Sequence, residues 1–348
     1  MTSSHGSVLT ASHATRKTSM RRQLDLFGEA PPPPLAPHVT DADRTLATAL
    51  PSFVRLGTST WTFPGWGGIL YEGSPSQDAL VRGGLGAYAR HPLFRTVGID
   101  RSYYGPLQDK DLEGYAAQLQ GTELLAVSKV WEEITMIAFP AHPRFGDRAG
   151  TRNPSFLDPS RTQDEVLAPY AHNFAEYTGP FVFEIPPAPQ GMLPDERAFS
   201  SAIERLLTAL PAQFRYAFEL RNRELLTARY LDTLRAHGAI HCFNMWTAMP
   251  TVGRQLELPG VITSDVVVCR LMLPPATRYE AMKKAYEPFN RIVREQPDMR
   301  SDVVRLALAC EELSVKALFV LVNNKAEGSA PLTVKALAEA IVRAREGR

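Results

Sequence analysis

Short apolar segments alternate with amphipathic segments eight times between residue 53 and the end of the chain. Each apolar segment has the length of one strand, and each amphipathic segment has the spacing of a helix. The expected strands cover residues 53–57, 96–100, 124–129, 180–185, 215–221, 239–244, 266–271 and 317–323. The expected helices cover residues 78–90, 109–119, 163–177, 195–210, 227–236, 278–287, 301–313 and 333–345. This alternation predicts one α/β domain, a TIM-type (β/α)₈ barrel over residues 53–346.

A doubly wound open sheet is the alternative arrangement of the same units. Its dinucleotide-binding version carries Gly-x-Gly-x-x-Gly after the first strand, and this chain has no such pattern there. The net charge of +1 does not by itself indicate a nucleic-acid coat. No apolar run has the length that a bilayer requires, so we expect no membrane association. The three cysteines, Cys242, Cys269 and Cys310, are far apart, which favours reduced thiols and a cytoplasmic location.

Residues 1–52 differ from the rest because Ser, Thr, Ala and Pro dominate, including four consecutive prolines from Pro31 to Pro34. Such a segment buries too little apolar area to offset its loss of conformational entropy. We therefore expect a disordered leader, with residues before about 45 lacking regular structure. Its basic residues precede the first acid, Asp25, so a transit peptide stays open as an alternative.

The leader contains the peptide Gln23-Leu24-Asp25-Leu26-Phe27. Leu24, Leu26 and Phe27 are apolar residues in a polar segment with no core of its own. The peptide resembles those by which bacterial replication and repair proteins bind the DNA sliding clamp, with Gln23 in a polar subsite and the apolar residues in a groove. Packing of these residues on the barrel, or a chance match, is the alternative.

The first expected strand leads directly into a glycine-rich loop with two tryptophans, Trp61 and Trp66. Loops of this kind after a strand commonly form ligand-binding sites. The polar segment 142–159 follows the third strand, where it is either a lid or a passive insertion.

Charged and amide side chains stand at corresponding positions near the ends of the expected strands. Because strand side chains alternate between faces, Glu219 and Arg221 share one face with Ala217. In a barrel these strand ends meet at one mouth. The other residues at this level are Asp100, Lys129, Glu184, Asn244, Arg270, Asn323 and Asn324.

These residues suggest an anion site with acid–base groups. Glu219 or Glu184 is the candidate acid or base, and Lys129 is a third catalytic candidate. Lys129, Arg221 and Arg270 supply positive charge, and we expect them to line one pocket with Glu219 and Asn323. Asn323, Asn324 and the loop of Gly328 follow the eighth strand, where barrels often hold phosphate. Trp61, Trp66, Tyr103 and Tyr104 offer stacking surfaces for a sugar or base.

Structural ion pairs and ordinary packing are the alternative roles for these charges and rings. The histidines lack the paired spacing of a zinc-binding helix, so we expect no metal and no other cofactor. No serine or cysteine has an evident base partner, which argues against covalent acyl chemistry.

Gly57, Trp61, Trp66, Gly67 and Tyr71 stand in the order that opens the YecE-like family, the "domain of unknown function 72" proteins, and the chain resembles that family. Further resembling blocks are Thr96–Asp100, Tyr103-Tyr104, Lys129, Pro186-Pro187, Glu219-Leu220-Arg221 and Asn323-Asn324. The resemblance extends from Gly57 to about Ala330 and implies a barrel, but it implies no reaction.

The chain departs from the family pattern at four positions near the strand ends. Gly98 replaces a glutamate, Asp100 an asparagine and Met272 a histidine, while Asn244 stands where the family often has an aspartate. If those residues serve the family as bases or metal ligands, this chain has lost them, and Asp100 restores one carboxylate nearby.

Two functions are compatible with these patterns. One is an enzyme that acts on a phosphorylated or nucleic-acid ligand at the barrel mouth. The other is a non-catalytic module that binds anions or nucleic acid and is recruited to DNA repair or replication by its leader.

Overall fold

The computed structural model describes residues 34–274, 277 and 279–348. Within it, residues 35–348 form one unit. Residues 1–33, including Gln23, Leu24, Leu26 and Phe27, lie outside the described residues, so the predictions about the leader peptide remain predictions.

Eight parallel strands close into a barrel in which each strand is hydrogen-bonded to its neighbours in sequence order, and β8 pairs with β1. The TIM-type barrel is therefore confirmed, and the open sheet is excluded. Each strand lies within a residue or two of its expected position. The strands are β1 (Val54–Thr58), β2 (Thr96–Ile99), β3 (Leu125–Lys129), β4 (Thr178–Ile185), β5 (Tyr216–Leu220), β6 (Ile240–Met245), β7 (Val266–Leu271) and β8 (Ala317–Val322).

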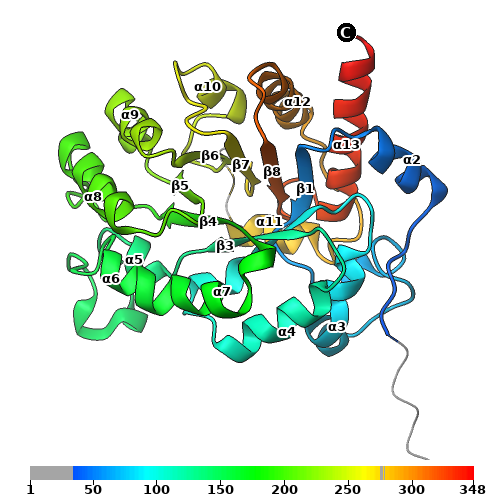
Figure 1. Cartoon of the computed structure of the whole chain (residues 1–348), viewed down its shortest axis with the longest axis horizontal. Coiled ribbons are helices and arrows are strands. Elements are labelled where there is room, and N and C mark those ends of the chain that lie inside the picture. Colours follow the sequence, from blue (N-terminus) through cyan, green and yellow to red (C-terminus); the bar gives the residue numbers. More distant parts are fainter. Residues whose placement is uncertain (1–33, 275–276, 278) are drawn as a thin grey trace, which may run out of the picture. The chain divides into compact units, whose positions relative to one another are not determined.

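The helices lie around the outside of the strands except for α11, which is drawn across the middle of the barrel (Figure 1). They are α2 (Asp41–Ala49), α3 (Gln77–Ala89), α4 (Asp109–Leu119), α5 (Glu132–Thr135), α6 (Pro159–Arg161), α7 (Ala168–Asn173), α8 (Glu196–Ala209), α9 (Ala228–Ala236), α10 (Val252–Leu256), α11 (Tyr279–Tyr286), α12 (Pro297–Glu312) and α13 (Ala330–Glu346). The expected helix 163–177 is instead a π-helical turn (Thr162–Leu167), α7 and a 3₁₀ turn (Ala175–Tyr177). Pro169 lacks an amide donor, which disfavours a regular helix through this region.

Helix α2 (Asp41–Ala49) corrects the prediction that residues before about 45 lack regular structure. Its start is fixed by a capping box, because the Thr40 side chain accepts from the Asp43 amide and the Asp43 carboxylate accepts from the Thr40 amide. Asp43 also pairs with Lys335 of α13 at 2.9 Å. Arg95 donates to carbonyl oxygens at the end of α2, the shortest bonds being 2.7 Å. These partners are distant in sequence, so local composition alone did not indicate the helix.

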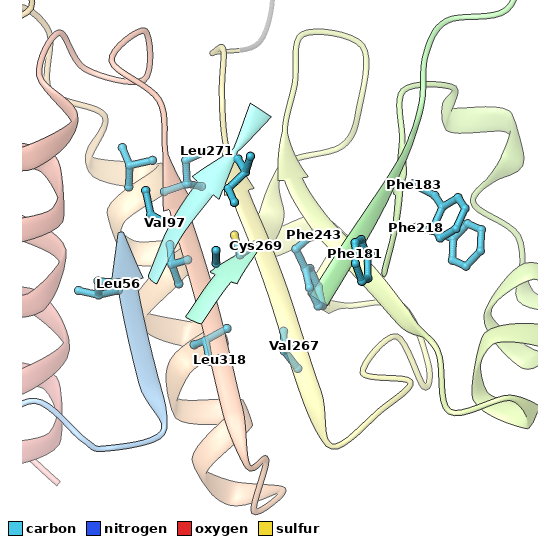
Figure 2. Packing of buried hydrophobic residues seen from close by; sticks show 14 of the residues in the cluster. Leu56, Val97, Phe181, Phe183, Phe218, Phe243, Val267, Cys269, Leu271 and Leu318 are labelled. Carbon is cyan, nitrogen blue, oxygen red and sulfur yellow. The ribbon is translucent and has the colours of Figure 1, made fainter. Parts of the chain in front are cut away.

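The outward-facing strand residues pack beneath the helices. Phe183 on β4 and Phe218 on β5 stack with ring centroids 5.0 Å apart, and Figure 2 shows them side by side. The inward-facing residues form a separate apolar cluster that includes Val127, Val182 and Val268. This interior cluster fills the middle of the barrel, so polar chemistry is confined to its two ends.

His241 on β6 faces outward and is 1% exposed. Its ring nitrogens lie 3.2 Å from the Tyr230 hydroxyl and 3.3 Å from Gln255 Oε1. Burial lowers the pKa of His241 from 6.5 to about 4, although the bond to Gln255 opposes that shift.

We predict that His241→Gln flattens the acid dependence of stability. Between pH 6.5 and 4 the unfolded chain binds a proton at His241 that the folded chain does not, so acidification destabilises the wild type. Relative to the variant, the wild-type free energy of unfolding should fall by up to about 1.4 kcal/mol per pH unit in this window. Urea unfolding at several pH values measures the slope. The control His237→Gln, at an exposed position, should keep the wild-type dependence of the free energy of unfolding on pH. If His241→Gln also kept the wild-type dependence, the prediction would be contradicted.

Candidate ligand-binding site at the barrel mouth

Six charged side chains meet at the C-terminal ends of the strands, as the alternation of strand side chains predicts. They come from the end of β3, from β4, β5 and β7, and from the residues that follow β2 and β5. The members are Asp100, Lys129, Glu184, Glu219, Arg221 and Arg270, and we call them the mouth cluster.

Arg270 is the centre of the mouth cluster. Its Nη2 donates to both oxygens of Asp100, at 2.9 and 3.0 Å, and its Nη1 contacts Glu184 at 3.1 Å and also Glu219. The side chain is 1% exposed. Burial alone would lower the pKa of Arg270, but the three carboxylates raise it well above its ordinary value. Arg270 therefore stays charged and joins four strands at one point.

Glu184 is surrounded by cations. Its Oε2 lies 2.8 Å from Lys129 Nζ and 3.1 Å from both Arg221 and Arg270. Burial would raise the pKa of Glu184, but these three cations hold it well below the usual 4.5. An ionised Glu184 accepts hydrogen bonds but has no proton to donate, so the acid role is disfavoured, and the role as a base stays a prediction.

Glu219 and Arg221 lie beneath the surface of the mouth. The Glu219 side chain is 0% exposed and contacts Arg270 and, at 2.6 Å, Arg221 Nη2. Glu219 is therefore covered by the other members of the mouth cluster, and its role as an acid or base stays a prediction. The guanidinium of Arg221 lies 4.0 Å from the ring centre of Trp246, and its Nε and Nη1 are buried without a hydrogen-bond partner among the described residues.

The charges of the mouth cluster are balanced. Three cations, Lys129, Arg221 and Arg270, face three carboxylates, and each cation has at least one carboxylate within 4.0 Å. The three cations therefore do not form the unpaired anion site that the sequence suggested. The side chains that remain partly accessible are Asp100, Glu184 and Lys129, at 27%, 13% and 11% exposure.

The aromatic candidates differ in their surroundings. Trp66 is 0% exposed, and its Nε1 donates to Asn324 Oδ1 at 3.3 Å. The same Asn324 oxygen accepts from the Ala330 amide at the start of α13. Trp66 and Asn324 therefore anchor the loop after β1, and the expectation that they contact a ligand stays a prediction. Asn323 is partly buried and accepts two bonds from Lys325.

Tyr104 is 72% exposed at the rim, and its ring packs edge-on against Tyr103. The Tyr103 ring lies 4.7 Å from Lys129 Nζ and so covers one side of the mouth cluster. Tyr104 thus offers a free ring face, as expected, at the outer edge of the mouth.

A cavity of about 350 Å³ lies beside Asp100. Its walls are the loops that follow β1 and β2 together with helices α3 and α4. Its polar and aromatic lining residues include Ser59, Thr60, Trp61, Asp100, Arg101, Lys110, Asp111 and Tyr115, and Arg101 pairs with Asp111 at 3.0 Å. The position of Asp100 at a strand end and of Trp61 in a glycine-rich loop predicted both as site residues. Lys110 and Tyr115 were not predicted, because they lie on a helix and the alternation of strand side chains applies only to strands. The hydroxyl groups of Ser59 and Thr60 were also not predicted as site groups, although the two residues are adjacent in the same loop as Trp61.

Two departures from the family pattern meet at Ser59. A side-chain carbon at Gly98 would lie 3.0 Å from Ser59 Cα, and the Ser59 hydroxyl is 3.9 Å from Met272 Sδ. The two positions where the family pattern has a glutamate and a histidine, occupied here by Gly98 and Met272, thus both lie next to Ser59. Asn244 is fully buried and donates to the Leu220 carbonyl at 2.9 Å, so it contributes to packing between strands.

Segment 142–159 and the residues before it form a small packed unit of their own. Met136, Phe139 and Phe145 make a separate apolar cluster. Arg144 pairs with Glu132 at 2.8 Å, and Arg148 pairs with Glu133. These contacts fasten the segment to helix α5.

Within residues 34–274, 277 and 279–348, no group of three or more His, Cys, Asp or Glu side chains is placed to hold a metal ion. In the same residues no helix has the length and apolar character needed to cross a membrane.

The fold and site define a TIM-type barrel with a charge-balanced mouth. The chain belongs to the family described as "Protein of unknown function DUF72", whose pattern matches residues 55–347. No curated protein matches the sequence.

Two solved structures share the fold. A DUF72 family protein from Enterococcus faecalis superposes with a TM-score of 0.58 at 14% identity, covering 83% of this chain and 95% of that chain. A DUF72 family protein from Thermotoga maritima superposes with a TM-score of 0.54 at 18% identity, covering 84% and 99%. At these identities the likeness concerns the fold alone.

We predict that Arg270→Met destabilises the protein by about 3–5 kcal/mol, because three carboxylates are left without their central cation. Urea unfolding measures the change. Arg343→Met, on the exposed face of α13, should change stability by less than about 1 kcal/mol. Adding Glu219→Gln to Arg270→Met should restore part of the loss, since it removes one uncompensated charge. An Arg270→Met variant as stable as Arg343→Met would show that the mouth cluster does not hold the barrel together.

Proposed function

We propose that the barrel mouth binds a small phosphorylated ligand that contains a sugar, either a free phosphosugar or a nucleotide. The cavity beside Asp100 has a volume of about 350 Å³, which is within the range of small-molecule sites. A site of this size fits one sugar-phosphate unit better than a length of nucleic-acid strand.

The observation that carries the proposal is the fixed carboxylate at the end of this cavity. Both oxygens of Asp100 are held by Arg270, at 2.9 and 3.0 Å, yet the side chain remains 27% exposed. A carboxylate whose orientation is set in advance accepts hydrogen bonds from ligand hydroxyl groups with little further ordering. The hydroxyl side chains of Ser59 and Thr60 line the same cavity and add donors and acceptors.

The phosphate would bind toward helix α4. Lys110 lines the cavity and lies in the first turn of that helix, where the helix dipole also favours negative charge. Asp111 of the same turn also lines the cavity, and its carboxylate is paired with Arg101 at 3.0 Å. Trp61 supplies an apolar wall, and its buried indole Nε1 has no acceptor among the described residues. A ligand oxygen would satisfy that donor.

The geometry favours binding over turnover. Glu184 stays ionised between its cations, and Glu219 is covered by the other members of the mouth cluster. Asp100 is thus the one carboxylate of the mouth cluster that borders the cavity. If the protein is an enzyme, we expect Asp100 to accept the proton.

Calorimetric titration with ribose 5-phosphate, ribose and inorganic phosphate tests the proposal. We expect ribose 5-phosphate to bind most tightly. Asp100→Asn should weaken it roughly 10- to 100-fold, the scale of a charged hydrogen bond. Lys110→Ala should remove the advantage of the phosphosugar over ribose. The exposed Asp298→Asn is the control and should have no effect.

Melting temperatures of all variants separate lost binding from lost folding. No measurable binding of ribose 5-phosphate or of nucleoside monophosphates at millimolar concentration would overturn the proposal. Product formation during the titration, followed by phosphorus NMR, would favour an enzyme over a binding module.

We also propose that the leader recruits the barrel to a bacterial DNA sliding clamp, and with it to DNA repair or replication. Support comes from the sequence alone. Leu24, Leu26 and Phe27 are apolar residues that follow Gln23 in a polar segment, and a proline-rich stretch separates them from the barrel.

A peptide covering residues 21–29 should bind a purified bacterial clamp with a micromolar dissociation constant, about −8 kcal/mol. Fluorescence anisotropy measures it. Replacing Leu26 and Phe27 together by Ala should abolish binding, whereas Glu29→Ala, outside the motif, should not. In the full chain the double replacement should leave the melting temperature unchanged. No binding at hundreds of micromolar, or a lowered melting temperature, would remove this proposal.

A further inference from the structure

The opposite end of the barrel contains a second cavity, of about 420 Å³. It lies at the N-terminal ends of the strands, since its walls include the first residues of β3, β7 and β8. Its lining includes Arg55, Phe214, Arg215, Val266, Ala317 and Phe319. We call it the basal cavity.

Arg55 is a cation without a carboxylate partner at the basal cavity. It is the second residue of β1, and its guanidinium lies 5.8 Å from the ring centre of Phe319 on β8. Its Nη1 donates to the backbone carbonyls of Glu123 and Arg95, at 3.2 and 3.5 Å. Among the residues that the structure describes, no carboxylate oxygen lies within 4.0 Å of Arg55.

The charges around the basal cavity are not balanced. Arg95 uses its guanidinium on backbone carbonyls, and Arg215 shares the carboxylate of Asp265 with Lys316, at 3.6 and 2.8 Å. The charged side chains that line the basal cavity are Arg55 and Arg215, and both are cations. Burial lowers the pKa of Arg55, and the charge of Glu123 opposes the shift. The mouth cluster, by contrast, has three cations and three carboxylates.

The rest of the basal cavity is largely apolar. Phe214, Val266, Ala317 and Phe319 contribute hydrocarbon surface, and the cavity is large enough for a small organic molecule. A bare inorganic anion would leave this surface in contact with water. A neutral hydrocarbon would leave the guanidinium unpaired.

We propose that the basal cavity is a second binding site, specific for an amphiphilic carboxylate. Its head pairs with Arg55 in the fork geometry that guanidinium groups form with carboxylates. Its aliphatic or aromatic body lies along Phe319, Val266 and Ala317. Val266 and Phe319 belong to the apolar interior cluster, whose other members include Val127, Val182 and Val268 and fill the barrel between this site and the mouth, so we expect the two sites to bind independently.

The experiment compares octanoate with octan-1-ol, which share an apolar body and differ in charge. Binding of each to the full-length protein is measured by calorimetry. We expect octanoate to bind at least 10-fold more tightly than the alcohol. Arg55→Gln should remove this difference without weakening the alcohol, whereas Arg55→Lys should keep part of it because the charge remains. Ala317→Phe, which fills the cavity, should weaken both.

Asp100→Asn at the mouth should leave octanoate binding unchanged, so failure of this site and failure of the proposed mouth site are distinguishable. Melting temperatures identify variants that fail to fold. Arg55→Lys supplies the charge comparison if Arg55→Gln does not fold. Equal affinity for octanoate and octan-1-ol in the wild type, or octanoate binding unchanged by both Arg55 variants, would overturn the proposal.

Discussion

The barrel mouth depends on placing one guanidinium among three carboxylates. Glu184 and Glu219 are directly opposite each other on β4 and β5, where two like charges would repel. Arg270 reaches across from β7 to contact both, and it also holds Asp100 after β2. Buried ions of this kind are stable only when each finds its partners, so these strands must close into a barrel before the charges can be buried.

This arrangement also decides which residues can meet a ligand. Arg270 and Arg221 both pair with Glu219 beneath the surface, although Nε and Nη1 of Arg221 have no hydrogen-bond partner among the described residues. Asp100 is different because one side is held by Arg270 and the other borders a cavity. The mouth therefore presents a fixed acceptor rather than a free cationic patch, which is why a hydroxyl-rich ligand fits it better than a bare anion.

The two ends of the barrel are electrostatically unlike. At the mouth, cations and carboxylates are equal in number, whereas at the base Arg55 bonds to backbone carbonyls and forms no ion pair within 4.0 Å in the described part of the chain. Both ends are closed off from each other by the interior cluster of Val127, Val182 and Val268. The N-terminal end of a TIM-type barrel is usually regarded as structural. In this protein it carries Arg55, a cation without an ion-pair partner among the residues described, whereas every cation of the mouth cluster has one.

The sequence by itself determined the eight strands, their order and which side chains face inward, because these follow from local hydrophobicity and the two-residue period of a strand. It therefore placed Asp100, Lys129, Glu184 and Arg270 at one mouth. Only the tertiary structure decided which of these charged side chains form ion pairs, since Arg270 and Asp100, for example, are 170 residues apart in the chain. Contacts between distant segments likewise bury Glu219 and Trp66, join Arg95 to helix α2 and form the walls of both cavities. No local sequence pattern encodes such contacts.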